Sequence, residues 1–138
     1  MNALLKAIYD KLCADTTLTA LLSTHAGLPA IFTSDIVPRG TSLPYCVMGL
    51  VSDEPYDTKD TRGRSVIVDI QVWYPSEGSV LNLNAAAERV RTLLHRVLLT
   101  VEGFNQIITS CSGPMDLSPD PIAWGRNVEL RTILFNSV

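Results

Sequence analysis

Histidine and cysteine are scarce in this chain. Two histidines stand among 138 residues, and the three cysteines, Cys13, Cys46 and Cys111, lie far apart. No CxxC, HxxxH or HExxH spacing occurs, so the usual zinc-binding motifs are absent from the sequence. An odd and dispersed set of cysteines is not a disulfide framework, so we interpret all three as buried structural thiols. We expect no metal and no cofactor.

Glycine and serine give no catalytic signature either. The eight glycines stand singly, so the sequence has no glycine-rich loop for a phosphate. GxSxG is absent, and neither His25 nor His95 has a carboxylate nearby in the sequence to orient its ring. His95 falls beside arginines on the expected polar side of a helix, so we interpret it as a solvated helix residue. We expect no enzymatic activity.

Lysine is also rare, and the basic residues do not cluster. Eleven basic residues stand against fourteen acidic ones, which gives a net charge of −3. Binding to nucleic acid requires clustered Lys and Arg, so specific DNA binding is not expected. No apolar run reaches the roughly 20 residues of a membrane span, and the N-terminus does not resemble a secretory signal. We expect a protein that is assembled in a cytosol, without a membrane partner.

Enough apolar residues remain for an ordinary core. They make up 46% of the chain, and no repeat, linker or low-complexity segment divides it. A chain of this length buries roughly 70% of its unfolded surface when it folds as one unit. We therefore expect residues 1–138 to form a single domain.

The clearest structural signal lies in residues 43–75. Apolar and polar residues alternate in its second half, which predicts a strand with one buried face: Val66, Val68, Ile70 and Val72 against Ser65, Asp69 and Gln71. The run Tyr45–Val51 before it is apolar on both parities, so we expect it to be covered on both sides. A long loop, Ser52–Arg64, joins the two strands, which favours a projecting hairpin.

Helical spacing and turn residues place the other elements. The sequence predicts a helix at Asn2–Asp15, a short helix at Leu18–Ser23 capped by Thr17, and a main helix at Val80–Leu99 with Gly103 as its C-terminal cap. It predicts a turn at 38–40, a break at 75–78, and strands at Phe104–Cys111 and Val128–Phe135. A short extended piece at Ile31–Phe32 or Ile36–Val37 is a further alternative. The order α-β-β-α-β-β predicts an α+β fold, in which two main helices pack on a largely antiparallel or mixed sheet of about four strands.

Several phrases then occur in a familiar order. ADTTLTALL ends the first helical region, LPY opens the first strand, SDEPYDT leads into the loop, RSVIVDIQVWYPS forms the second strand, and NAAAERVRTLLH lies in the main helix. In this order and spacing the sequence resembles the tail-completion, or tail-terminator, family of long-tailed bacteriophages and prophages. LPY and SDEPYDT are the more specific phrases, and the last quarter of the chain matches only in outline.

The resemblance implies a structural role. Members of that family form a hexameric ring on the finished tail tube, end its polymerisation and present the surface to which head-completion (connector) proteins dock. It implies no cofactor, no catalysis, and DNA that only passes through the central channel. The expected location is the head-proximal end of the virion tail, with assembly in the host cytoplasm. A net negative charge suits a lumen that should not hold DNA, and a ring contact would cover exposed sheet edges.

The hairpin loop carries both signs of charge. We expect it to contact a neighbouring subunit or the end of the tube through Asp53, Glu54, Tyr56, Asp57, Lys59, Asp60, Arg62 and Arg64. A solvated loop with no partner is the alternative.

Two further charged residues, Asp69 and Arg131, are expected on the outward face of the sheet, in or near an interface. Asp69 is expected to meet Arg131 or Arg126 on the neighbouring strand or on another subunit. The simpler alternative is a solvent-facing pair between strands.

Two other functions stay open at this stage. The chain could be a different ring protein of the head–tail connection, such as a head-closure adaptor. It could also be a small α+β ligand-binding or enzymatic domain, with a site between sheet and helix.

Overall fold

The computed structural model describes residues 2–33, 41–75, 79–117 and 123–136, and gives only the backbone of Ile107. The turn expected at 38–40 and all but the first residue of the break expected at 75–78 lie outside these residues. The elements along the chain are α1 (Asn2–Cys13), α2 (Thr16–Thr19), β1 (Thr24–His25), β2 (Leu28–Pro29), β3 (Ile31–Phe32), β4 (Tyr45–Pro55), β5 (Gly63–Pro75), α3 (Val80–Leu94), β6 (Phe104–Asp116) and β7 (Ala123–Asn136). None of the described helices is long and apolar enough to cross a membrane.

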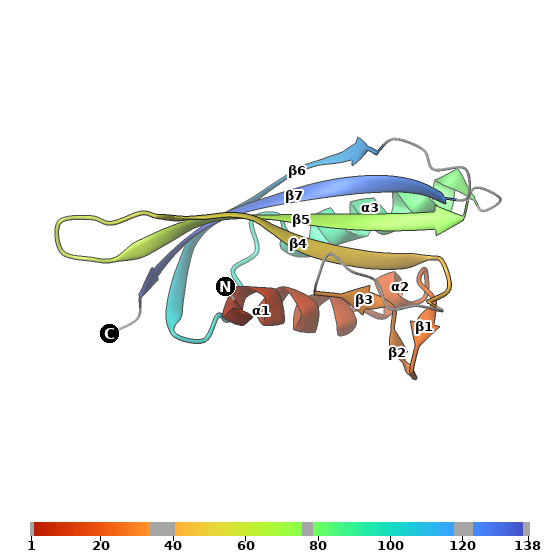
Figure 1. The fold of residues 1–138 in the computed structure, drawn as a ribbon, viewed down its shortest axis with the longest axis horizontal. Helices are drawn as coiled ribbons and strands as arrows, with labels where there is room; N and C mark the ends of the chain where they lie inside the picture. The colour runs from red at the N-terminus through yellow and green to blue at the C-terminus, as the bar shows by residue number, and fades with distance from the viewer. Residues whose placement is uncertain (1, 34–40, 76–78, 118–122, 137–138) are drawn as a thin grey trace.

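The α+β class is confirmed, but the expected strand count and order are wrong. Five strands form one sheet in the order β3-β4-β5-β7-β6, and β1 and β2 form a separate two-stranded hairpin (Figure 1). The sheet is mixed, because β3 runs parallel to β4 while the other neighbours are antiparallel. The short strand β3 at one edge lies at one of the two places, Ile31–Phe32 and Ile36–Val37, where the sequence allows a short extended piece, although neither was counted among the four expected strands. Ile36–Val37 lies outside the described residues.

The helices define two faces of this sheet. Alternate residues of the central strands point into one core together with residues of α1 and α3, and we call this side the helix face. We call the other side the open face. The expected alternation on β5 is confirmed, since its apolar set lies at the helix face and is fully buried: Val66, Val68, Ile70 and Val72. Burial of this kind contributes about 1.5–3 kcal/mol for each large aliphatic side chain.

Strand β4 is covered on both sides only in its first half. Cys46, Val47 and Met48 are buried, as a run that is apolar on both parities predicts. Leu50 and Val51 are exposed, so the expectation fails for them. The reason is a register shift between Leu50 and Ser52, which makes Val51 an extra residue in the strand.

The helix that follows α1 is shorter than predicted and has a different cap. Helix α2 begins at Thr16, and its N-cap is Asp15 rather than Thr17, because the Leu18 amide donates to Asp15 Oδ2 at 2.8 Å. Helix α2 ends at Thr19, where a helix up to Ser23 was expected, and the β1–β2 hairpin follows from Thr24 to Pro29. Ala26 and Gly27 have φ angles of 53° and 80°, which suit a two-residue hairpin turn.

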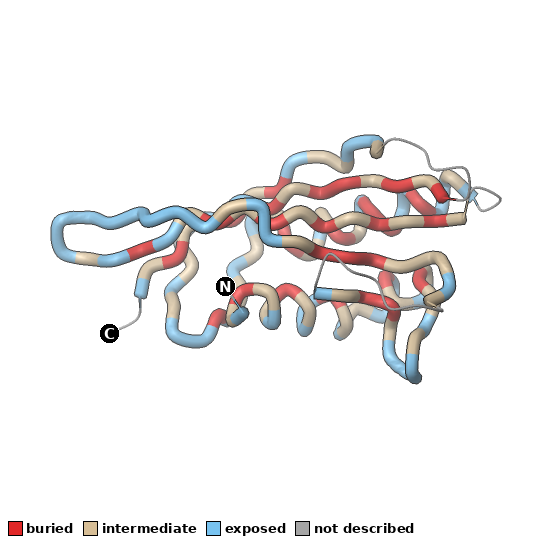
Figure 2. The backbone as a smooth tube through the Cα atoms, in the orientation of Figure 1, coloured by how far each residue is buried: buried red, intermediate tan, exposed pale blue. Residues whose placement is uncertain are grey.

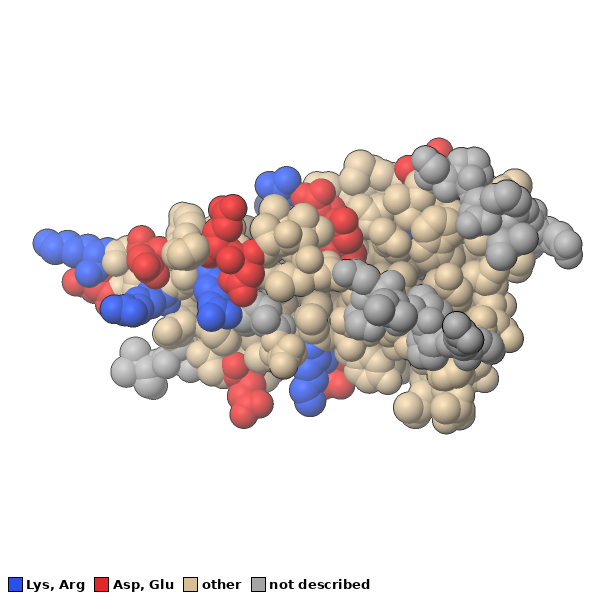
Figure 3. All heavy atoms as spheres, in the orientation of Figure 1, with Lys and Arg blue, Asp and Glu red and all other residues tan. Residues whose placement is uncertain are grey.

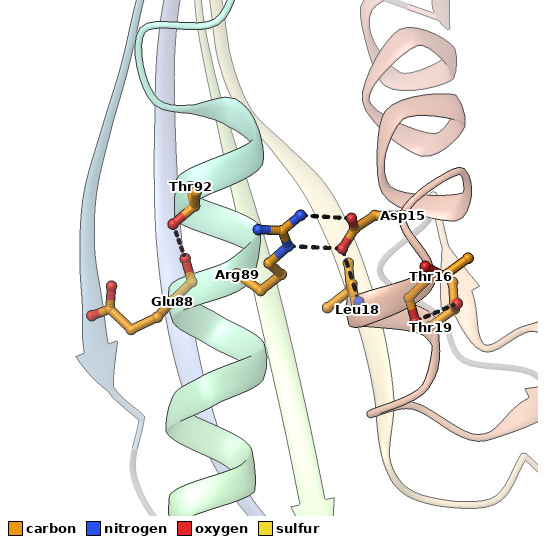
Figure 4. Close-up of polar contacts among 7 residues, drawn as sticks. All are labelled: Asp15, Thr16, Leu18, Thr19, Glu88, Arg89 and Thr92. Atoms are coloured by element: carbon orange, nitrogen blue, oxygen red, sulfur yellow. Dashed lines mark hydrogen bonds and ion pairs between the residues drawn. The ribbon is translucent and has the colours of Figure 1, made fainter.

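Asp15 also joins the N-terminal region to the main helix. Arg89 of α3 donates from Nε to Oδ2 at 2.9 Å and from Nη2 to Oδ1 at 2.7 Å, a paired arrangement that Figure 4 shows. The Arg89 guanidinium lowers the pKa of the Asp15 carboxyl below its ordinary value. One carboxylate therefore caps α2 and fixes α2 to α3.

The main helix ends five residues before the predicted boundary, and His95 is the reason. Helix α3 stops at Leu94, and the His95 ring accepts a hydrogen bond at Nδ1 from the Cys111 amide at 3.0 Å. The next amide, of Arg96, donates to the Thr109 carbonyl at 3.1 Å. His95 is thus not a solvated helix residue, because it covers part of the outer edge of β6. Gly103 does not cap the helix, and it lies in the turn before β6 with a φ of 84°.

The last two strands are longer than predicted. Strand β6 continues beyond Cys111 to Asp116 across a register shift, and β7 begins at Ala123 rather than Val128. The proline-rich loop between them is correspondingly shorter. Pro114 is tolerated in β6 because an edge strand has backbone groups that need no partner strand.

The cysteines are free, and two of them are buried. Burial raises the pKa of the Cys46 thiol to about 12 and that of Cys111 to about 11, so both stay protonated and unreactive. The structural interpretation is confirmed for these two. Cys13 is only half-buried, contrary to the expectation, and its pKa is raised chiefly by that partial burial.

Candidate assembly interface

The hairpin of β4 and β5 projects well beyond the rest of the molecule (Figure 1). We call its outer part, residues 51–66, the arm. Most of the arm is exposed (Figure 2), and its buried residues are Gly63 and Val66. The strands extend further than predicted, so the connecting loop is residues 56–62. Asp53, Glu54 and Arg64 therefore lie on strands and not in the loop.

Hydrogen bonds order the tip of the arm. The Tyr56 amide donates to the Gly63 carbonyl at 2.9 Å, and the Thr58 amide donates to the Thr61 carbonyl at 2.8 Å. The Asp57 carboxylate accepts from the Gly63 amide at 3.1 Å, so this predicted interface residue has a role within the loop. The arm holds its shape without a partner, which reduces the entropy cost of binding one.

Gly63 sets the close packing at the base of the arm. It is buried, and a Cβ at this residue would lie 2.6 Å from the Phe135 ring and 2.7 Å from the Tyr56 carbonyl oxygen. The Tyr56 and Phe135 rings contact each other with centroids 6.1 Å apart. Only glycine allows the loop to close this tightly against β7.

The charges of the arm divide into paired and free groups. Arg64 Nη1 donates to Asp53 Oδ2 at 3.2 Å, and the Arg64 guanidinium lies 5.8 Å from the centre of the Phe104 ring. These residues line a depression of about 410 Å³ at the base of the arm. The remaining predicted charges are exposed on the outer arm: Glu54, Lys59, Asp60 and Arg62.

Figure 3 shows how unevenly charge is distributed on this side of the molecule. Side chains of both signs gather on and beside the arm, whereas few appear in this view on the described part of the opposite end. A projecting element with mixed charge can form several ion pairs with a partner, and such pairs favour one orientation of binding over others.

On the open face, the expected pairing of Asp69 is wrong. Asp69 lies opposite Glu129 of β7, and Arg131 pairs with Glu129 through a 2.8 Å contact. Arg126 lies at the helix face, where it contacts Asn84 and Asp116 at 3.0 Å. Among the described residues, the Asp69 carboxylate has no hydrogen bond or ion pair. The alternative that Asp69 meets another subunit stays open.

Sequence reasoning missed the exposed apolar residues at the two edges of the sheet. Leu50 and Val51 lie on β4, and Leu98 and Ile108 lie at the β6 edge. A helix continued to Leu99 placed Leu98 in the core, so the sequence carried no signal for its exposure. Over the described ranges, no group of three or more His, Cys, Asp or Glu side chains could hold a metal ion.

Solved structures share this fold. One chain from a structure described as "Virion of native gene transfer agent (GTA) particle" has a TM-score of 0.82 at 21% identity, and the match covers 98% of this chain and 96% of that one. A second solved chain has a TM-score of 0.53 at 11% identity, with 99% and 95% covered. Identities this low establish the fold alone. Among curated proteins, no sequence matches this chain.

A family model matches the greater part of the chain. The model describes "Tail completion protein gp17", and the match spans residues 6–112. These residues include most of α1, all of α2 and α3, the arm, Asp69 and most of β6. The tail-completion resemblance noted in the sequence is therefore confirmed. The chain belongs to the tail completion protein gp17 family and is a structural tail protein of a phage-like virion.

Proposed function

We propose that this chain forms a closed ring on the head-proximal end of a tail tube, ends the polymerisation of the tube, and provides the surface that the head joins. The observation that carries the proposal is the arm. It is an ordered, charged hairpin that projects from a body with its own core, and most of its residues are exposed in the isolated subunit. We interpret such an element as a contact site for another molecule, because surface segments held by a rigid body commonly carry binding residues.

The proposed partners of the arm are a neighbouring subunit and the tail tube protein. The exposed charges Glu54, Lys59, Asp60 and Arg62 would supply the ion pairs of that contact, and Tyr56 an apolar anchor. Tyr56 is exposed yet held against Phe135, so little side-chain freedom would be lost on binding. Head-completion proteins would bind the other side of the ring.

The proposed ring is a hexamer, in keeping with the resemblance of the sequence to tail terminators. Contacts between two different surfaces of identical subunits close into rings when the rotation allows it. DNA would only pass through the channel. The net charge of −3 supports this, because an acidic lumen does not retain phosphates.

Removal of the arm tip tests the proposal. Residues 56–61 are replaced by Asn-Gly, a pair that favours a tight hairpin turn. We expect a folded subunit that no longer forms rings, and particles with tubes of uncontrolled length in negative-stain images. The matched control removes an exposed ion pair far from the arm, Lys6 with Asp10 on α1, by serine substitution at both positions. Normal rings and normal tube length in the arm variant would refute the proposal.

A further inference from the structure

The five-stranded sheet ends in two edges, and each has an exposed apolar patch. The first, the β4 patch, consists of Gly49, Leu50, Val51 and Asp69. Leu50 is 42% exposed and Val51 is 55% exposed. All four residues line one depression of about 340 Å³, which the missing side chain of Gly49 leaves open above the sheet. An apolar side chain from outside the subunit would fit into it.

The second, the β6 patch, lies at the opposite edge of the same sheet. It consists of Arg96, Leu98 and Ile108, which line a depression of about 320 Å³. Leu98 is 64% exposed and Ile108 is 54% exposed. Apolar side chains at this level of exposure, gathered at one place on an edge, are typical of contact surfaces rather than of scattered surface residues.

The two patches carry opposite charges, and neither charge has a partner among the described residues. The Asp69 carboxylate lacks a partner within the described chain, and its cross-strand neighbour Glu129 is already paired with Arg131. The Arg96 guanidinium also has no hydrogen bond or ion pair to any described residue. The β4 patch therefore combines an apolar pair with one negative charge, and the β6 patch combines an apolar pair with one positive charge.

Neither edge offers a free run of backbone for strand addition at its patch. The register shift at Val51 interrupts the edge of β4, and β3 covers Cys46 and Val47 before it. On β6, the Cys111 amide donates to His95 Nδ1, and the Thr109 carbonyl accepts from the Arg96 amide. Such features prevent unlimited edge-to-edge pairing of strands. Contact between the two edges would therefore be made by side chains.

We propose that the β4 patch of one subunit binds the β6 patch of the next, with Asp69 and Arg96 paired across the contact. The occupant of each patch is thus a second copy of this chain. The two surfaces differ and lie toward opposite edges of one sheet, so the contact is head-to-tail, which is the type of contact that builds a ring when the rotation between subunits closes. This inference rests on the ring of the proposed function and names the surfaces that build it.

Charge exchange at the two residues tests the pairing. Asp69→Arg should leave the subunit folded, because it replaces a like-charge pair with Glu129 by an opposite-charge pair. Arg96→Asp changes an exposed residue. We expect each single variant to lose the oligomer in sedimentation and light-scattering measurements over a range of concentrations. The double variant should regain it, and should not co-assemble with the unchanged chain.

Directed crosslinking gives a second, independent measurement. Two variants, Val51→Cys and Leu98→Cys, are prepared in a Cys13→Ala background, since Cys46 and Cys111 are buried. Mixed under mild oxidation, they should form adducts that join one variant to the other. Neither variant alone should form adducts, because a head-to-tail contact does not bring a patch against its own copy.

The outcomes separate this inference from the proposed function. Oligomers of ring mass without mixed adducts, or with adducts within a single variant, would overturn the patch assignment and leave the ring standing. Failure of the double charge exchange to restore assembly would overturn the assignment as well. A chain that stays monomeric at every concentration and forms no adducts would count against both the contact and the ring.

Discussion

Replacing Gly63 by alanine tests whether the arm depends on close packing at its base. The added Cβ would lie 2.6 Å from Phe135 Cδ1, 2.7 Å from the Tyr56 carbonyl oxygen and 2.8 Å from the Leu134 carbonyl oxygen, where ordinary contact begins at 3.4 Å. The Phe135 ring can move, but the two carbonyls belong to the backbone. The Leu134 carbonyl lies in the strand paired with β5, so relief requires the arm to shift.

The expected cost is that of overpacking a filled space. Insertions of a methyl group into tight packing cost about 1–3 kcal/mol, and two backbone contacts favour the upper half of that range, about 2 kcal/mol or more. With an m-value of about 2 kcal/mol per molar urea, the unfolding midpoint should fall by about 1 M. The Tyr56 amide should also exchange faster with solvent, because its 2.9 Å bond to the Gly63 carbonyl is displaced.

Gly103→Ala is the matched control for this substitution. It makes the same chemical change where no atom lies within 4 Å of the new Cβ, at a φ of 84°. It should cost about 1–2 kcal/mol through the left-handed backbone alone and leave the Tyr56 amide unchanged. A loss of less than about 0.5 kcal/mol in Gly63→Ala, which is the range of ordinary surface changes, would refute the reasoning.

Two further substitutions test contacts that fix the elements around the arm and the sheet edge. The carboxylate of Asp15, whose pKa Arg89 lowers, contributes stability that is complete above the ordinary Asp pKa of about 3.9 and is lost as pH falls through the lowered folded-state value. Asp15→Asn keeps a capping side chain but should flatten the acid side of a Tm-against-pH curve, and an unchanged slope would contradict this. His95→Ala leaves the Cys111 amide at the β6 edge without its acceptor and should cost about 1 kcal/mol, with faster exchange of that amide. Thr92→Ala on the exposed side of α3 serves as its control, and equal exchange in both variants would rule out the edge-covering role.

The sequence predicted correctly those elements in which the periodically spaced apolar residues are also the buried residues. Strand β5 is the best case, because its alternate valines and isoleucine face the helices from Val66 to Val72. The end of α3 could not be predicted in the same way. Val97 and Leu98 continue the helical spacing, but tertiary bonds from His95 and Arg96 to β6 end the helix first. A local sequence pattern carries no information on contacts with a strand that lies further along the chain.

The sequence predicted only one part of the candidate interface, because the other part also depends on contacts between distant segments of the chain. The charged hairpin is visible as composition, and its projection follows from the long, polar segment between two strands. The partner of Asp69 depends on register, which sets Glu129 opposite it and places Arg131 beside Glu129 instead. Patterns of period two identify a face but not the residue across from it. The β4 patch depends on the extra residue at Val51, and an alternating pattern of apolar and polar residues does not reveal such an insertion.

The pairing of β5 with β7 also governs how quickly a subunit becomes available for assembly. The β4–β5 hairpin closes a short loop, so the arm can form on the time scale of an isolated hairpin, about 1–10 μs. The β5–β7 ladder instead pairs Gly63 with Phe135, across α3 and β6, so it must close a long stretch of chain first. Proteins dominated by such non-local pairings fold in roughly milliseconds to seconds. The body is therefore the slow part of folding, and the proposed ring assembly would be limited by formation of the sheet edges rather than of the arm.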